Sequence, residues 1–199
     1  MAKIIGLTGG IATGKTTVAN FFKEAGIPVI ETDQIAKSLF TPGSEVYQKV
    51  IAIFGEDIVF ANEEINRKAL GEKIFNDDSL RESLNKIVHP EVRLIVRSQA
   101  DVLKKEGHSL IVIDVPLLFE AKFDREVDVT VVVSIPKTVQ LERLMNRDSI
   151  KKPYALKKIN AQMSLKEKRA KADYVIDNRG SILDTKTQFN TIIAALKES

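Results

Sequence analysis

The segment from Gly9 to Thr16 constrains the fold of this chain more than any other feature. It reads GGIATGKT and fits the pattern G-x-x-x-x-G-K-[S/T]. In such a loop, consecutive backbone N–H groups turn inward around a phosphate, at the positive end of the helix that follows. Within it, we expect Lys15 to bridge the β- and γ-phosphates of a nucleotide and the Thr16 hydroxyl to ligate Mg²⁺.

Both flanks of this loop support that interpretation over a glycine turn that carries GKT by chance. A β-branched run at residues 3–8 precedes the loop, and an apolar helix face follows it at Val18, Phe21, Phe22 and Ala25. Gly26 supplies a helix C-cap, and Pro28 prevents the helix from continuing.

Strand-like runs recur along the chain, and several are followed by helical patterns, which is typical of a parallel sheet. We expect five strands, at residues 3–8, 27–31, 110–115, 127–135 and 174–177, and a closing helix that ends near Leu196. The third and fourth runs are almost continuously apolar, as strands buried on both faces are. The sequence therefore predicts an α/β fold with a five-stranded parallel sheet.

Two stretches depart from this alternation. Residues 34–107 contain helical patterns and no convincing strand, so we expect a helical insertion there. Its expected helices are at residues 44–54, 67–75 and 91–105. A second stretch, residues 143–169, is dense in Lys and Arg and contains Pro153, which favours exposed, mobile helices.

Composition excludes several classes of protein. The chain has 199 residues and no Cys, so we expect one domain without a disulfide framework or a Cys-bound metal. Its 30 basic and 27 acidic residues are interspersed and leave a charge of only +3, a mild preference for anionic ligands that is too weak to indicate DNA or RNA binding. No signal-like segment is present and no apolar run reaches the ~18 residues of a membrane span, so we expect a cytoplasmic protein.

Two acidic residues come at predicted strand ends, where side chains face a common ligand crevice. Asp33 can accept a proton from a substrate hydroxyl or orient it for in-line attack on a phosphoryl group. Its alternative role is the N-cap of the following helix. Asp114 can hold Mg²⁺, and its alternative is a turn residue before Pro116.

Three apolar residues and two arginines complete the candidates. Leu117, Leu118 and Phe119 either line a pocket for an apolar part of a substrate or belong to the core. Arg143 and Arg147 are four residues apart on one helix face. They can close over a nucleotide as a lid and neutralise charge on the transferred phosphoryl oxygens, or form a solvated basic face.

Taken in order, these motifs resemble the dephospho-CoA kinase family from Ile4 to about Gly180. The matching segments are LTGGIATGKTTVANFF, VIETDQIA, LNKIVHPEVR, VIDVPLLFE, QLERLMNRD, INAQM and ADYVIDNRG. The resemblance implies ATP-dependent phosphorylation of the ribose 3′-hydroxyl of dephospho-coenzyme A, with Mg²⁺, giving coenzyme A and ADP in the last step of coenzyme A synthesis.

The resemblance also implies a P-loop, nucleoside-monophosphate-kinase-like three-layer core, here a single domain over residues 1–199. Residues 34–108 would form the helical acceptor-binding insertion and residues 140–170 the lid. We expect a monomer or small homo-oligomer with no nucleic-acid or membrane partner.

The resemblance assigns roles to individual residues. Asp33 matches the catalytic base, and Arg143 and Arg147 match the lid arginines that act with Lys15. The nucleotide-binding residues it implies are Gly10, Ile11, Ala12, Thr13, Gly14, Lys15, Thr16, Thr17 and, near the adenine, Asn178. The acceptor-binding residues it implies are Asp33, Arg67, His89, Arg93, Leu117, Leu118 and Phe119, and the metal-binding residues are Thr16 and Asp114. On the residues alone, His89 reads as a helix N-cap before a proline at N1.

This chain departs from the family's usual pattern at three places. Ala12-Thr13 stands where Gly-Ser is common, which is tolerable only if residue 12 does not need a positive φ. Lys158 stands where Arg is common, so a bidentate phosphate contact would become a point charge. Asn66 stands before Arg67 where Asp is common.

Other functions fit parts of the sequence. A kinase of another small hydroxyl acceptor, such as shikimate or a nucleoside, would share the loop and Asp33. A GTP-dependent switch generally uses N-K-x-D, but Asn85-Lys86 is followed by Ile87-Val88 and has no preceding strand. An RNA-binding module could use the basic stretch at residues 143–169, but Tyr154 is the only aromatic residue there.

Overall fold

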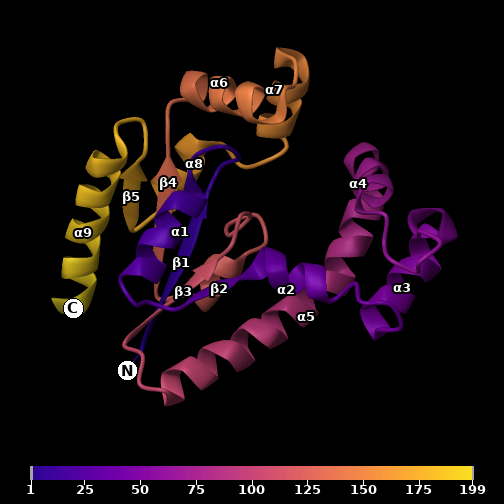
Figure 1. Cartoon of the computed structure of the whole chain (residues 1–199), viewed down its shortest axis with the longest axis horizontal. Helices are drawn as coiled ribbons and strands as arrows, with labels where there is room; N and C mark the ends of the chain where they lie inside the picture. The colour runs from indigo at the N-terminus through magenta and orange to yellow at the C-terminus, as the bar shows by residue number, and fades with distance from the viewer. Residues whose placement is uncertain (1, 199) are drawn as a thin grey trace. The chain divides into compact units, whose positions relative to one another are not determined.

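The computed structural model describes residues 2–198 (Figure 1). The strands are β1 (Lys3–Gly9), β2 (Val29–Glu31), β3 (Leu110–Asp114), β4 (Val129–Ser134) and β5 (Tyr174–Asp177). The α-helices are α1 (Lys15–Glu24), α2 (Thr32–Ser38), α3 (Glu45–Phe54), α4 (Arg67–Asn76), α5 (Asp78–Lys105), α6 (Lys137–Asp148), α7 (Lys152–Asn160), α8 (Leu165–Lys171) and α9 (Ile182–Glu198). Short 3₁₀ turns lie at Glu56–Ile58 and Phe123–Glu126.

The five strands form one parallel sheet in the order β2-β3-β1-β4-β5, so this prediction is confirmed. The central strand β1 pairs with β3 on one side, with Ile5 opposite Val112, and with β4 on the other, with Leu7 opposite Val131. Because neighbouring strands run the same way, their carboxyl ends meet at one edge of the sheet. The phosphate loop leaves the sheet at this edge.

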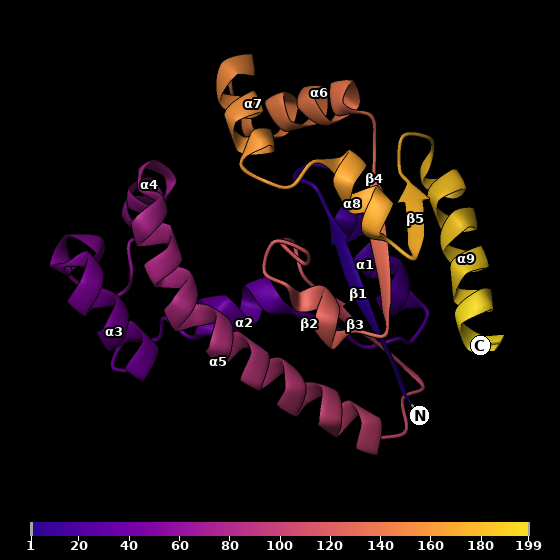
Figure 2. The same cartoon turned by 180° about the vertical axis from the view of Figure 1, so that it is seen from behind.

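Helices cover both faces of this sheet. On one face, α1 packs over β1 and α9 over β5, and the ring of Phe22 meets that of Phe189 edge-on at 4.9 Å. On the other face, a Cβ added to Gly6 would lie 3.0 Å from the side chain of Leu118. Figure 2 shows α8 in front of the sheet and α1 behind it. The core therefore has three layers, as expected.

The buried residues of α1 are those predicted from its apolar face, except at the C-terminal end. Val18, Phe21 and Phe22 are buried, but Ala25 is exposed because the helix ends at Glu24. Gly26 then adopts a left-handed φ of 72°, and the N–H of Ile27 donates to the carbonyl of Phe22 at 3.0 Å. This is the hydrogen bond of a Schellman C-cap.

The chain divides into two compact units, of which the sheet and its covering helices form one. This unit comprises the residues up to Ile30 and those from Ala100 onward. The second unit, Glu31–Gln99, is helical. In it, the side chain of Ser44 caps α3 and that of Asn66 caps α4 by accepting from the N–H of Ala69 at 3.1 Å. Asn is as good an N-cap as Asp, so this structural role does not require the more common residue at position 66.

The helix expected at residues 91–105 is longer, and the prediction that His89 is its N-cap is wrong. α5 begins at Asp78 and contains Pro90 in its interior. Proline removes one helix hydrogen bond and crowds the preceding turn, but Pro90 lies on the exposed side. The buried positions run through it at helical spacing, at Leu84, Val88, Val92, Val96 and Ala100. Burial of this continuous apolar stripe outweighs the local cost of the proline.

No helix within residues 2–198 is long and apolar enough to cross a lipid bilayer.

Candidate active site

The loop after β1 has the conformation of a phosphate cradle. The backbone N–H and the side-chain hydroxyl of Thr13 both donate to the carbonyl of Gly10, at 3.2 and 2.9 Å, which closes a tight turn. Helix α1 begins at Lys15, directly after the loop. The N–H groups of its first turn have no acceptor within the helix, and the helix dipole adds positive potential there. This donor set suits a phosphate group.

Asn178, at the end of β5, holds the loop from one side. Its Nδ2 donates to the carbonyl of Thr13 at 2.7 Å, and its Oδ1 accepts from the hydroxyl of Thr185 at 2.8 Å. A Cβ at Gly14 would lie 2.0 Å from this Nδ2, and Gly14 has a φ of 87°. Both observations require glycine at position 14. The position of Asn178 near an adenine stays a prediction.

Lys15, the first residue of α1, and Asp114, the last residue of β3, form an ion pair. Asp114 is only 9% exposed, so its carboxylate faces the loop and does more than end a strand. Lysine is a mobile point charge and can exchange a carboxylate for phosphate oxygens. Asp114 and Thr16 also provide the hard oxygen donors that Mg²⁺ prefers. Residues 2–198 contain no group of three or more His, Asp or Glu side chains that could hold a metal ion.

The loop carries backbone strain at Ala12. Its φ is 61°, in the left-handed region. Alanine would be tolerated without cost only if residue 12 did not need a positive φ, so this alanine is strained. Two glutamines hold the adjacent peptide in place. The side chain of Gln162 accepts from the N–H of Ile11 at 2.8 Å, and that of Gln140 donates to its carbonyl at 2.9 Å. Surrounding contacts of this kind are what allow a strained residue to persist.

The predicted lid arginines both lie on α6, which packs against α7 through Leu144, Ala155 and Ile159. Leu144 and Ala155 are 0% exposed, so the expectation of exposed helices is wrong for this inner face, whose side chains pack against each other. Mobility stays a prediction. Arg143 and Arg147 are at least partly accessible, as a role in binding phosphate requires.

Asp148, the last residue of α6, pairs with two basic side chains. It accepts from Nε of Arg147 at 2.8 Å and from Nζ of Lys158 at 2.9 Å, and these bonds lower the pKa of Asp148 to about 2. Lys158 also lies 5.4 Å from the centre of the Tyr154 ring. Because the partner of Lys158 is a single carboxylate oxygen, a point charge serves this contact as well as the forked group of arginine.

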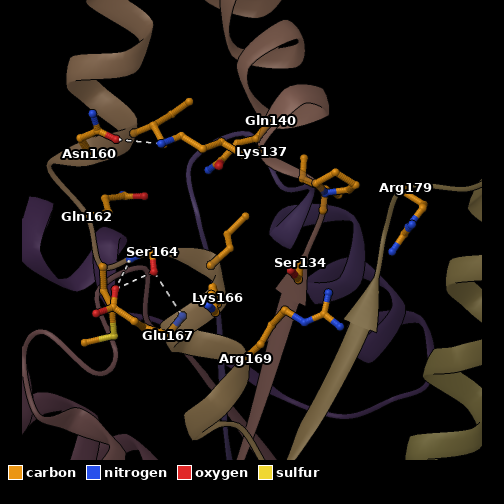
Figure 3. A pocket seen from close by; sticks show the side chains of 15 residues that line it. Ser134, Lys137, Gln140, Asn160, Gln162, Ser164, Lys166, Glu167, Arg169 and Arg179 are labelled. Atoms are coloured by element: carbon orange, nitrogen blue, oxygen red, sulfur yellow. Dashed lines mark hydrogen bonds between the residues drawn. The ribbon is translucent and has the colours of Figure 1, made fainter.

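A pocket of about 710 Å³ lies beneath these helices (Figure 3). Ser134, Arg169 and Arg179 line one side of it, and Gln140 links it to the phosphate loop. The hydroxyl of Ser134 is the only buried side-chain polar atom in residues 2–198 without a hydrogen-bond partner. Such an atom is costly to leave unpaired and suits a polar ligand. Sequence reasoning did not single out Gln140 or Gln162, because their contacts are with the distant Ile11, nor Ser134, whose burial at the pocket depends on the folded chain.

The apolar segment after β3 is mostly core. Leu118 and Phe119 are buried, with Leu118 against Gly6, whereas Leu117 is 41% exposed. The core alternative therefore describes Leu118 and Phe119. Leu117 is the one side chain of the three with substantial surface to offer a ligand.

The remaining predicted residues lie in the helical unit. Asp33 is exposed in the first turn of α2, whose N-cap is Glu31 without a side-chain hydrogen bond, so the N-cap alternative for Asp33 is wrong. The structure brings Arg67 to α2, where its guanidinium donates to the carbonyl of Lys37 at 3.2 Å. His89 and Arg93 are one turn apart on α5. Burial and, to a lesser extent, the charge of Arg93 lower the pKa of His89.

Replacing Ala12 with glycine should stabilise the protein. Glycine adopts a φ of 61° without steric cost, and this relief exceeds the extra entropy of glycine in the unfolded chain. We expect the Ala12→Gly variant to gain about 0.5–1 kcal/mol in free energy of unfolding, measured by urea titration. The matched control is Ala172→Gly, since Ala172 has a φ of −83° and should lose stability. A loss of stability in both variants would show that residue 12 is not strained.

His89 should make stability depend on pH. Its pKa in the folded chain lies below the ordinary 6.5, so the unfolded chain binds more protons at lower pH. The melting temperature should therefore fall as the pH decreases from 6.5 towards the pKa of His89 in the folded chain. Well above pH 6.5, His89 should have no effect on how the melting temperature changes with pH. Between pH 7.5 and pH 5, His89→Gln should lose less thermal stability than the unmodified protein. His108→Gln, which changes the only other histidine, is the control. Identical pH profiles for His89→Gln and the unmodified protein would contradict the prediction.

Comparisons with known proteins identify the family of this chain. The sequence profile of the dephospho-CoA kinase family matches residues 3–184. A dephospho-CoA kinase of Bacillus licheniformis is 45% identical over 193 residues, which cover 97% of this chain and 96% of that protein. A dephospho-CoA kinase of Arabidopsis thaliana is 42% identical, over 98% of this chain and 84% of its own length.

Solved structures show the same fold. The solved structure of a dephospho-CoA kinase from Campylobacter jejuni superposes with a TM-score of 0.74 at 27% identity, over 100% of this chain and 98% of that one. A shikimate kinase from Acinetobacter baumannii matches with a TM-score of 0.54 at 15% identity, over 100% and 96% of the two chains, which shows only that the fold is shared. With a profile match over nearly the whole length and relatives above 40% identity, this chain belongs to the dephospho-CoA kinase family.

Proposed function

We propose that this protein transfers the γ-phosphoryl group of ATP to the ribose 3′-hydroxyl of dephospho-coenzyme A and releases coenzyme A and ADP. The observation that carries the proposal is the phosphate loop with its Lys15–Asp114 pair, in a chain of this family. The shikimate-kinase-like alternative draws on fold alone and is not favoured. We expect the reaction in the cytoplasm, in a monomer or small homo-oligomer, with no nucleic-acid partner.

In this mechanism, the phosphate loop binds the nucleotide. The N–H groups at the start of α1 hold the phosphates of ATP, and Lys15 turns from Asp114 towards the β- and γ-phosphates. Thr16 and Asp114 would hold Mg²⁺, which neutralises phosphate charge when bound. The pocket lined by Ser134, Arg169 and Arg179 offers polar groups and space for the nucleoside end, next to Asn178.

Phosphoryl transfer through a loose transition state needs placement and charge stabilisation more than covalent chemistry. Asp33 orients the 3′-hydroxyl and takes its proton late in the step. Arg143 and Arg147 supply N–H donors to the oxygens of the phosphoryl group and exclude water from it. For Arg147, this requires exchange of its contact with Asp148.

The helical unit provides candidates for holding the acceptor. Arg67 and Arg93 carry positive charge suited to a pyrophosphate, and His89 adds a neutral donor at physiological pH because its pKa is lowered. Leu117, Leu118 and Phe119 stay predicted acceptor neighbours, although burial leaves Leu117 the most surface for direct contact.

The deciding experiment measures ADP release with ATP and Mg²⁺, with and without dephospho-coenzyme A, followed by mass analysis of the product. We expect ADP release that depends on the acceptor and a product heavier by one phosphoryl group at the ribose. Shikimate and a nucleoside serve as comparison acceptors and should give background rates. Turnover with either of them, and none with dephospho-coenzyme A, would overturn the proposal.

Replacing the proposed base should separate chemistry from nucleotide binding. Asp33→Asn keeps the size of the side chain but cannot take the proton, so we expect kcat to fall about 10²-fold or more. The Kd for ATP, measured by calorimetric titration, should stay within about twofold, a change of less than 0.5 kcal/mol. Asp101→Asn, at an exposed position on α5, is the control and should keep full activity. Near-normal turnover of Asp33→Asn would remove Asp33 from the mechanism.

A further inference from the structure

Lys168 is a cation buried inside the unit that carries the phosphate loop. It lies on α8, and its side chain is 0% exposed. Its Nζ donates to the carbonyls of Gly9 and Pro116, at 3.2 and 3.0 Å, and pairs with Oε1 of Glu120 at 3.0 Å. An ammonium group has three N–H bonds, so these three acceptors use all of them.

This arrangement is specific to Lys168. Its neighbours on the same helix, Lys166 and Lys171, are exposed, as a basic surface stretch predicts. Burying an ammonium group is costly unless it is paired and fully hydrogen-bonded. Burial lowers the pKa of Lys168, whereas Glu120 raises it. Lys168 is buried and all three of its N–H bonds have acceptors, so its role differs from that of the exposed basic residues around it, which keep the surface soluble.

The three partners of Lys168 come from the segments that form the nucleotide site. Gly9 is the first residue of the phosphate loop. Pro116 follows Asp114 by two residues, and its carbonyl also accepts from the hydroxyl of Thr8 at 3.1 Å. Glu120 also accepts from the N–H of Met163 at 2.9 Å, in the segment that returns from α7 to α8. One ammonium group thus joins the end of β1, the segment after β3 and the return from the lid.

The segment between α7 and α8 also contacts the phosphate loop at a second residue. Gln162 accepts from the N–H of Ile11, so residues 162–168 hold the loop at both Gly9 and Ile11. The strained Ala12 lies directly after these contacts. Burial is the main cause that lowers the pKa of Lys168, and the positive charge of Lys15 lowers it further.

We propose that Lys168, with Glu120 as its counter-ion, is a positioning residue that keeps the phosphate loop and the Asp114 segment in the geometry that binds a nucleoside triphosphate. It contacts only protein groups and acts through the loop. The inference rests on the proposed function only in taking residues 9–16 as the ATP site, and not on the identity of the acceptor.

The test compares Lys168→Met with Lys171→Met, the same substitution at an exposed position of the same helix. We measure the Kd for ATP with Mg²⁺ by calorimetric titration, and KM for each substrate. Lys168→Met should raise the Kd and KM for ATP about tenfold or more, because small displacements of a binding loop are costly. KM for dephospho-coenzyme A should change less than about twofold, and Lys171→Met should match the unmodified protein within about twofold in every constant.

Glu120→Gln keeps the test decisive if Lys168→Met does not fold. The amide oxygen of Gln can still accept from Met163 and Lys168, but the charge that balances the ammonium is gone. We expect a rise of about threefold or more in the Kd for ATP, with the same split between the substrates. A lower melting temperature with an unchanged Kd for ATP in the folded variants would overturn the positioning role. Normal ATP binding without turnover of dephospho-coenzyme A in the unmodified protein would instead contradict the proposed function.

Discussion

A phosphate loop binds its ligand with backbone N–H groups, so its shape must be held by residues outside it. Strain at Ala12, a non-glycine residue with a φ of 61°, shows that this shape is not the one the chain prefers locally. Four side chains from later segments hold it in place: Gln140, Gln162, Lys168 and Asn178. The rest of the sheet unit can be understood as the support that brings these groups to residues 9–16.

The parallel sheet provides this support through its order. With β1 between β3 and β4, the strand ends place Asp114 beside Lys15 and Ser134 at the pocket. The chain after β4 then forms α6, α7 and α8, and so contributes both the predicted lid arginines and contacts that hold the loop. Residues 162–168, which follow the two helices of the predicted lid, therefore help to hold the geometry of the loop through Gln162 and Lys168.

Prediction from sequence succeeded where the signal is local and failed where packing outweighs it. The strands were found because apolar, β-branched runs are visible in any window of the chain. Pro90 misled the expectation for His89, because the apolar stripe that continues the helix outweighs the cost of one proline. The basic stretch suggested a solvated surface, and nothing in its composition distinguishes Lys168 from its exposed neighbours.

The order of residues along the chain was enough to establish the phosphate loop, the five parallel strands and the family, since each depends on neighbours within a short window. Folding was needed to select Gln140, Gln162, Lys168 and Ser134 from many similar polar residues. Their roles arise from partners 50 to 160 positions away or from burial at the pocket, and pairings over such distances leave no periodic trace in the sequence.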